Sequence, residues 1–262
     1  LIGNAIAAPL AALNIAVDGS LQVLYPSYVA SQNPLPTFYH ASSNNFGASW
    51  NYNLAIALTP GAADTNYKNA YHLLCHPTDA NKMCFVMTGY TYNDADIFSI
   101  HSEDGGNTWS AIQRVNDDAQ SNGKGQDMVW SAYNERGDIA ICWRDRRNAS
   151  NNGFWNADYQ FYYTTSTDNG ASFSTNKMIN TSLIPFDSLI VENGNDVMCS
   201  AFHADTLYTV WGDTRNGKMN IYFNKILSSS NASIGFADLD NSLDWTIFPN
   251  PSHDIVKIKG AP

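Results

Sequence analysis

The segment SEDGGNTWS at 102–110 recurs along the chain at a nearly constant spacing. Related segments are SNNFGASW at 43–50, STDNGASF at 166–173 and the degenerate SSNASIGF at 229–236, so the first serines lie 59, 64 and 63 residues apart. A period of about 60 residues is too long for most helical repeats and suits a four-stranded sheet. The sequence therefore predicts an array of similar sheets.

The sequence around the motif repeats as well. The segment 126–148 aligns with 195–216 with one residue fewer in the turn, and with 70–90 and 8–27 without a gap, so that Gly19 falls on Gly137. Each unit contains two short apolar segments around a polar turn, a longer loop, a third apolar segment and then the motif. Period-two alternation and aromatic or β-branched residues predict strands, and no segment shows sustained helical periodicity. We expect an all-β fold.

The motif predicts a tight corner, and its chemistry is structural. A short polar side chain accepts hydrogen bonds from nearby backbone amides, glycine adopts a positive φ, and an aromatic ring anchors the turn between sheets. Burial of the ring, about 1.5–3 kcal/mol, outweighs a hydrogen bond of about 1 kcal/mol. The residues concerned are Asn45, Gly47 and Trp50, Asp104, Gly106 and Trp109, and Asp168, Gly170 and Phe173.

These segments resemble the Asp-box, or bacterial neuraminidase repeat, with the pattern S/T-x-D-x-G-x-S/T-W/F. The resemblance covers about residues 8 to 240 and implies a sialidase-like β-propeller of four-stranded blades, in which the motif joins the third and fourth strands. Four repeats are fewer than the six or seven blades that the resemblance implies, so the ring is small, open or incomplete. The abrupt start of the sequence favours an interior piece of a longer precursor.

The composition limits the classes of partner that the chain can bind. The chain has 262 residues and a formal net charge of -10, which argues against nucleic acid or an anionic membrane as a partner. No apolar run reaches about 18 residues, so no membrane span is expected. The apolar start is interpreted as a strand. We assign 1–240 to the propeller and 241–262 to a linker and the beginning of a second domain.

The last segment, 247–260, resembles the start of the C-terminal sorting domain of the type IX secretion system. An aromatic-Pro-Asn-Pro sequence at 248–251 precedes a strand-like segment at 254–258. An ordinary proline-rich linker is the alternative. The resemblance implies secretion machinery as a partner and a protein that is secreted or held at the outer cell surface.

Four cysteines occur without a CxxC pair, and the histidines are scattered, so neither a metal nor a cofactor is expected. Cys75 and Cys84 flank a polar segment, and a four-residue turn at 78–81 would place them opposite each other on adjacent strands. A disulfide between them and two free thiols both remain open.

Candidate site residues follow from strand direction. In an antiparallel four-stranded unit, the start of the first strand and the end of the second lie on the face opposite the motif, where propellers usually bind ligands. A repeated D-x-R sequence follows the second strand and is interpreted mainly as an ion pair of the scaffold, and Trp143 and Trp211 are assigned to the core. The candidates are Asp127, Asp196, Arg144, Arg147, Arg215, Tyr71, Glu192 and, in a long inserted loop, Trp155.

The resemblance to sialidases implies three arginines around a substrate carboxylate, a tyrosine activated by glutamate, and an aspartate as acid and base. The Arg-Ile-Pro segment usual in that family is absent. Arg144 or Arg147 with Arg215 would supply two arginines, and Tyr71, Glu192 and Asp127 match the other roles by position only. The sequence therefore predicts a non-catalytic propeller that binds extracellular glycan, with an exo-sialidase or another glycoside hydrolase as the alternative and a lyase as a third possibility.

Overall fold

The computed structural model describes residues 11–27, 37–58, 70–150, 154–186, 198–217, 220–228, 247–248 and 257–258. These residues form four antiparallel sheets that follow one another along the chain, and one short strand pair. A single 3-10 turn, η1 (Phe154–Asn156), is the one helical element among them. The all-β prediction is confirmed.

Each strand pairs with the next strand in the sequence. The first sheet consists of β1 (Ala12–Ile15), β2 (Leu21–Ser27), β3 (Thr37–Ser43) and β4 (Asn51–Ala57). The second consists of β5 (Tyr71–Cys75), β6 (Met83–Gly89), β7 (Asp96–Ser102) and β8 (Gln113–Arg114). The third consists of β9 (Gln126–Tyr133), β10 (Ile139–Asp145), β11 (Gln160–Ser166) and β12 (Lys177–Met178). The fourth has three described strands, β13 (Met198–His203), β14 (Thr206–Asp213) and β15 (Asn220–Leu227).

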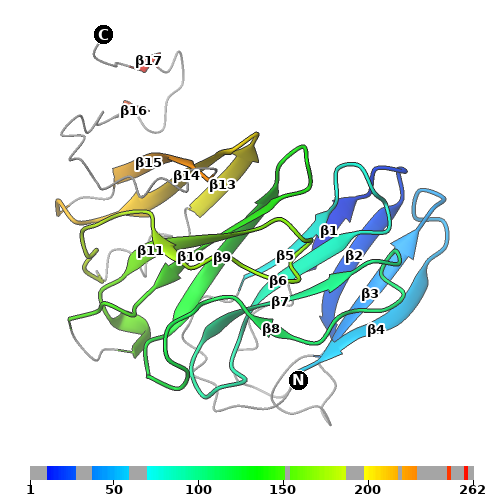
Figure 1. The fold of residues 1–262 in the computed structure, drawn as a ribbon, viewed down its shortest axis with the longest axis horizontal. Helices are drawn as coiled ribbons and strands as arrows, with labels where there is room; N and C mark the ends of the chain where they lie inside the picture. The colour runs from blue at the N-terminus through cyan, green and yellow to red at the C-terminus, as the bar shows by residue number, and fades with distance from the viewer. Residues whose placement is uncertain are drawn as a thin grey trace.

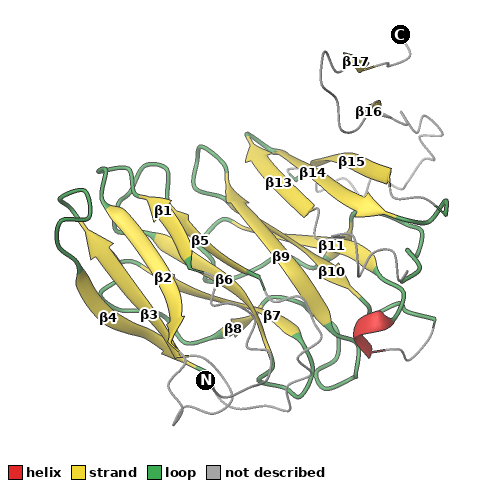
Figure 2. Cartoon of the chain, turned by 180° about the vertical axis from the view of Figure 1, so that it is seen from behind, coloured by secondary structure: helices red, strands yellow, loops and turns green. Residues whose placement is uncertain are grey.

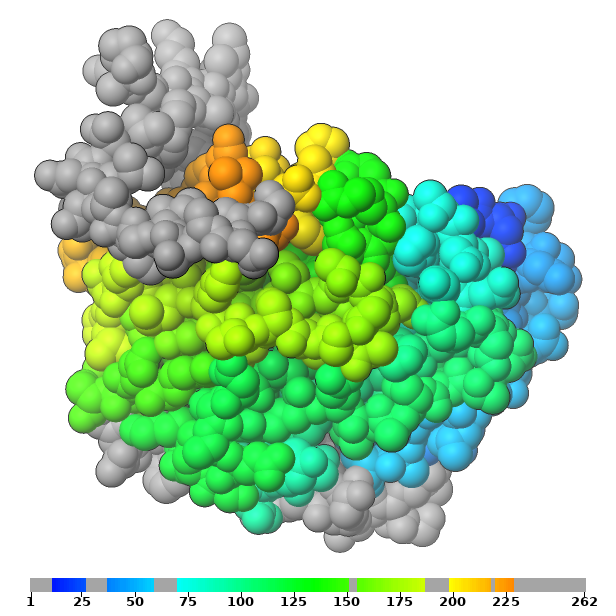
Figure 3. All heavy atoms as spheres, viewed as in Figure 1, coloured from blue at the N-terminus to red at the C-terminus, as the bar shows by residue number. Residues whose placement is uncertain are grey.

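The sheets stand side by side in chain order, with the first sheet at one end of the row and the fourth at the other (Figures 1 and 3). A layer of buried apolar side chains separates each sheet from the next, and together these layers form the core. Leu24 and Phe38 meet Phe85 in the first layer. Val86 meets Ile141 in the second. The third layer lies between the third and fourth sheets and contains residues such as Cys142, Phe161, Phe202 and Trp211.

The repeated motif forms the same corner three times. In the second sheet, the Ser102 hydroxyl donates to Asp104 (2.9 Å) and accepts from the Gly106 amide (2.9 Å), while Asp104 accepts from the Thr108 amide (2.9 Å). The Trp109 indole donates to the Gly106 carbonyl over 3.1 Å. Corresponding bonds recur at 43–50 and 166–173. The three described corners therefore share one hydrogen-bonding pattern; the degenerate copy at 229–236 lies outside the described residues.

In two of the three corners, the aromatic ring of the motif packs against an apolar layer between sheets, as expected. Trp109 packs against the apolar layer between the first and second sheets. Phe173 packs against the layer between the second and third. The corner thus joins its own sheet to the preceding one.

Of the two alternatives left open for Cys75 and Cys84, the structure has the free thiols and not the disulfide. The seven residues between β5 and β6 place Cys75 opposite Met83 and Leu74 opposite Cys84. Because neighbouring residues in a strand point to opposite faces, the two thiols lie on different sides of the sheet. All four cysteines of the chain are free.

In the last segment, β16 (Ile247–Phe248) pairs with β17 (Lys257–Ile258). The remainder of the sorting-domain segment lies outside the described residues, so that assignment and the domain boundary at 240 stay predictions. Among the residues that the structure describes, no helix is long and apolar enough to cross a membrane.

Candidate functional site

Strand direction gives the row of sheets two distinct edges. One, here called the loop edge, carries the starts of β5 and β9, the ends of β6 and β10 and the loops that follow them. The other, the corner edge, carries the tight turns and the repeated motif. Figure 2 shows η1 at the opposite end of the third sheet from the turn between β9 and β10. Tyr71 begins β5, Asp127 lies near the start of β9 and Arg144 near the end of β10, whereas the motif follows β3, β7 and β11.

At the loop edge of the third sheet, Asp127 holds two arginines. Arg144 donates Nε and Nη2 to the two carboxylate oxygens, both over 2.6 Å, and Arg146 adds contacts of 3.1 and 3.3 Å. All three side chains are buried. Burial alone would raise the pKa of Asp127, but the two guanidiniums and their hydrogen bonds outweigh it and hold this pKa well below its ordinary value.

A second arrangement follows β10 and β14 and is repeated. Asp145 accepts from the Trp143 indole (2.7 Å) and from the Arg147 amide (2.8 Å) and Nε (3.0 Å). The Arg147 guanidinium lies 4.3 Å from the ring centre of Tyr162. Trp211, Asp213, Arg215 and Tyr222 reproduce these contacts in the fourth sheet. The D-x-R ion pair of the scaffold is confirmed, and both tryptophans are buried in the core.

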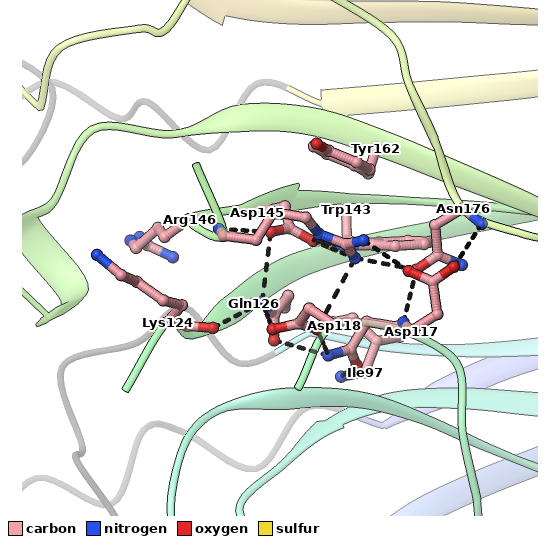
Figure 4. Close-up of polar contacts among 12 residues, drawn as sticks. Ile97, Asp117, Asp118, Lys124, Gln126, Trp143, Asp145, Arg146, Tyr162 and Asn176 are labelled. Carbon is pink, nitrogen blue, oxygen red and sulfur yellow. Dashed lines mark hydrogen bonds and ion pairs between the residues drawn. The ribbon is translucent and has the colours of Figure 1, made fainter. Parts of the chain in front are cut away.

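Polar contacts connect the second and third sheets at this edge (Figure 4). Arg147 donates to Asp117 over 2.6 Å and to Asn176 over 2.9 Å. The Asp117 backbone amide in turn donates to the Asn176 side-chain oxygen over 2.7 Å, and the Asn176 backbone amide donates to the Asp117 carboxylate over 2.9 Å. These bonds fix the loop after β8 against the third sheet, with the Asp117 side chain 40% exposed.

Beneath that loop, the buried side chain of Asn116 forms hydrogen bonds with several neighbouring residues. Its amide nitrogen lies 2.7 Å from Asp96, 2.7 Å from Asp118 and 2.8 Å from Gln126. Its carbonyl accepts from the Ile97 amide over 2.8 Å. Asn180 makes the equivalent bond to the Phe161 amide in the third sheet (2.7 Å), so this arrangement belongs to the scaffold.

Asp94, in the loop between β6 and β7, is a site residue that the list of candidates missed. Its Oδ2 accepts from the Gly123 amide over 3.1 Å. Oδ1 of Asp94 and Oδ2 of Asp96 are both buried, and neither oxygen accepts a hydrogen bond within the described chain. Burial and the neighbouring charge of Asp96 raise the pKa of Asp94 to about 6. The sequence feature that could have indicated Asp94 is the acidic segment YNDAD at 92–96, which lies at the loop edge.

Trp155 lies in η1, as part of an aromatic group between two loops. Its ring is half-buried and meets Phe186 edge to face at 5.2 Å. It also packs against Tyr90 and Ala95, which belong to the loop of the second sheet. The Arg146 guanidinium donates to the Trp155 carbonyl over 3.1 Å and fixes the position of the turn. Tyr90 and Ala95 are buried in this group, whereas Trp155 and Phe186 are partly exposed.

Every arginine of the chain forms an ion pair with an aspartate. The pairs are Arg114 with Asp96 and Asp118, Arg136 with Asp138 and Asp205, Arg144 and Arg146 with Asp127, Arg147 with Asp145 and Asp117, and Arg215 with Asp213. Arg136 lies at the corner edge, beside the turn between β9 and β10. Each of the six guanidiniums therefore already has a carboxylate partner within the described chain.

The structure brings together only some of the predicted site residues. Asp127 and Arg144 are in contact, whereas Arg215 lies in the fourth sheet beside Tyr222. Tyr71 packs between the first two sheets, with its ring 5.1 Å from that of Phe38. Asp196 and Glu192 lie outside the described residues. No group of three His, Cys, Asp or Glu side chains in the described part is arranged to hold a metal ion.

No protein-family model matches the sequence, and no curated protein matches it. Solved structures do match in fold. The α-L-arabinanase of Penicillium chrysogenum is 13% identical, with 87% of this chain and 64% of that chain covered and a TM-score of 0.53. The α-L-arabinofuranosidase of Fusarium graminearum is 13% identical, with 84% and 62% covered and a TM-score of 0.51. The Hadza microbial sialidase Hz136 is 14% identical, with 82% and 43% covered and a TM-score of 0.50.

These similarities define the fold class. The chain has a β-propeller architecture of antiparallel sheets, of the kind found in sialidase-like and arabinan-acting enzymes. It spans less than two thirds of the length of each of these three structures. At such low identity the likeness establishes the fold alone.

Proposed function

We propose that this protein is a sialidase-like propeller whose loop edge binds an extracellular glycan without cleaving it. The observation that carries the proposal is the pairing of all six arginines with aspartates. A sialidase needs guanidinium donors for its substrate carboxylate. Here, removing an arginine from its buried carboxylate would leave an uncompensated charge at a cost of several kcal/mol. A glycan without a carboxylate therefore fits this edge better than sialic acid.

The aromatic group around Trp155 supports carbohydrate as the ligand. The Trp155 side chain is partly exposed, and Trp and Tyr are suited to ligands that are apolar on one side and polar on the other. Asp117, 40% exposed in the loop that follows β8 of the second sheet, also lies at the loop edge and supplies hydrogen-bond acceptors for hydroxyl groups.

A glycan array tests this proposal directly. The wild-type protein is expected to bind a set of neutral glycans, and Trp155→Ala to lose most of that binding. Phe46→Ala is the matched control, because Phe46 is an aromatic residue that is 96% exposed at the corner edge. Binding to no glycan, or equal binding by wild type and Trp155→Ala, would contradict the proposal.

A glycoside hydrolase is the second candidate, and Asp94 is the observation that favours it. A carboxyl with a pKa raised to about 6 is suited to act as a general acid. Incubation with fluorogenic arabinofuranosides and sialosides decides between the candidates. Turnover that Asp94→Asn abolishes would establish the hydrolase; no turnover together with glycan binding supports the binding module.

The family and the location belong to the same proposal. The hydrogen bonding repeated in three corners supports their assignment as Asp-boxes, and the sequence at 247–260 supports type IX secretion to the medium or the outer surface. Removal of 247–262 is expected to retain the protein inside the cell. Unchanged export of the truncated protein would refute the sorting role.

A further inference from the structure

A pocket opens at the corner edge between the first and second sheets, which stand side by side at one end of the row (Figure 1). This place is here called the first junction. The pocket has a volume of about 160 Å³, and its described lining comes mainly from the turns and corners of the two sheets. Of these lining residues, only Ala80 and Gly105 lack a polar side chain. The pocket is therefore surrounded by hydrogen-bonding groups.

The register of the strands identifies the equivalent place between the second and third sheets, here called the second junction. In each sheet the second strand meets the first serine of the corner in the same way, through the pairs Leu21–Ser43, Met83–Ser102 and Ile139–Ser166. Counted from these pairs, the equivalent residues of the first and second junctions are Ser20 and Lys82, Asn44 and Glu103, and Gly105 and Asn169. The first junction thus has small side chains where the second junction has larger ones.

In the second junction, the side chain of Asn169 fills this place. It is buried, and its amide nitrogen donates to the Ser102 carbonyl over 3.1 Å and to the Glu103 carboxylate over 2.7 Å. Its side-chain oxygen accepts from the Tyr133 hydroxyl. Lys82 forms an ion pair with Glu103 over 3.6 Å beside it. One carboxamide group therefore occupies the second junction and forms hydrogen bonds through both of its polar atoms.

The residue at the same position of the first junction is Gly105, which has no side chain. Its backbone conformation is the same as that of Asn169, with φ angles of 72° and 58°. A Cβ at Gly105 would have a single atom of the described chain within 4 Å, Oδ1 of Asn81 at 3.8 Å. The Gly105 amide also donates to the Asn81 carbonyl over 2.9 Å, which fixes this side of the pocket. The pocket is therefore open where the Asn169 side chain lies in the second junction.

The charge of the lining disfavours an anionic ligand. Hydrogen bonds from the Ser20 hydroxyl (2.7 Å) and amide (3.0 Å) lower the pKa of Asp18, so its carboxylate is charged at neutral pH. None of the described lining residues is Lys or Arg. A single exposed carboxylate attracts a cation only weakly in water. The side-chain amides of Asn44, Asn51 and Asn81 offer both donors and acceptors, so the lining is suited to an uncharged polar ligand.

We propose that this pocket binds a small uncharged molecule through an amide group, which takes the place that the Asn169 carboxamide has in the second junction. Ser43 and Asn44 line the pocket at the positions of Ser102 and Glu103, which accept the hydrogen bonds of Asn169. A primary carboxamide and an N-acetyl group share this chemistry, since both have an N–H donor beside a carbonyl acceptor. A volume of about 160 Å³ corresponds to about five water molecules, which limits the ligand to about one sugar ring or a smaller amide.

An NMR titration tests the site, with the backbone amide signals of Gly105 and Asn81 as reporters. Acetamide is the probe for a primary carboxamide and N-acetylglucosamine the probe for an N-acetyl group, with glucose as the control that lacks the amide. We expect saturable shifts of both signals with at least one of the two amides and none with glucose. Gly105→Asn is the matched variant, because it supplies its own carboxamide in a backbone conformation that Asn169 already adopts. We expect this variant to fold and to lose the ligand-induced shift of Asn81.

The reciprocal variant Asn169→Gly opens the equivalent place in the second junction. We expect it to lower the melting temperature, because it removes a buried side chain and its hydrogen bonds. Acetamide should then raise the melting temperature of this variant more than that of the wild type. An equal rise in both proteins would contradict the equivalence of the two junctions on which the inference depends.

Three results of the titration would overturn the inference. No saturable shift with either amide would mean that the pocket binds no amide. Shifts with glucose as large as those with the amides would mean that the amide is not the recognised group. An undiminished shift of Asn81 in Gly105→Asn would place the ligand elsewhere. All of these measurements concern the corner edge, so the inference and the proposed function of the loop edge, which depends on Trp155, fail separately.

Discussion

His40 of the first sheet lies directly against Gly106 in the corner of the second. The imidazole is buried and lies 2.8 Å from the Gln22 side-chain oxygen and 3.1 Å from that of Asn53. Asn53 also donates to the Gly106 carbonyl over 2.6 Å. A Cβ at Gly106 would lie 2.3 Å from Cε1 of His40, so only glycine permits this approach. The corner therefore serves as a contact between sheets as well as a turn within one.

Gly106→Ala is expected to destabilise the protein more than Gly19→Ala. Both glycines have a positive φ, 83° and 85°, so both substitutions carry a similar backbone cost of about 1 kcal/mol. Gly19 has open space around it, whereas alanine at 106 collides with His40 and adds about 1–3 kcal/mol. Denaturant unfolding of both variants measures the difference. Equal losses would show that the His40 contact does not constrain this position.

Asp127→Asn is expected to reduce the free energy of unfolding by about 3–5 kcal/mol, because it leaves two buried guanidiniums without their carboxylate. Asp205→Asn is the matched control, since it removes the same charge from an exposed pair with Arg136 and should change stability little. Chemical denaturation compares the two variants. A similar small loss in both would mean that Asp127 is not the counter-charge of Arg144 and Arg146.

The buried thiols are expected to resist alkylation in the native protein. Burial raises the pKa of Cys84 and of Cys142 to about 12, which removes the reactive thiolate at neutral pH. Mass spectrometry after brief treatment with iodoacetamide should find both residues unmodified, and modified once the protein is unfolded in guanidinium. Rapid native modification of either residue would contradict the packing of the layers around them.

The fold was predictable because its determinants are local and repeated. Four copies of the alternating pattern gave the strands, and the corner residues Asp104, Gly106 and Trp109 make the bonds that their chemistry requires. Register was harder to predict. The Cys75–Cys84 disulfide required eight residues between the two paired positions, whereas the structure has seven between β5 and β6. The polar segment does not distinguish the two lengths, but a shift of one residue moves the Cys84 side chain to the other face of the sheet.

The site was only partly predictable, because its contacts join residues that are far apart in the sequence. The ion pair within D-x-R is local and was expected, whereas the pairing of Asp127 with Arg144 depends on two strands that meet at one edge. Asp94 was not a candidate because its burial, which raises its pKa, depends on the loop that contains Gly123. Acidic loops without such a cover are usually solvated.

Acid is expected to destabilise the protein through Asp127. Its pKa in the folded protein lies well below the ordinary value of 3.8, so the stability it contributes is present above that pH and is lost as the pH falls toward the folded value. Denaturation curves between pH 5 and pH 2 should show a loss of stability in the wild type, part of which is absent from Asp127→Asn. Carbon-13 NMR of the wild-type carboxyl groups provides a readout that does not need the variant. An Asp127 carboxyl that titrates at or above 3.8 would show that the two arginines do not hold it in its charged form.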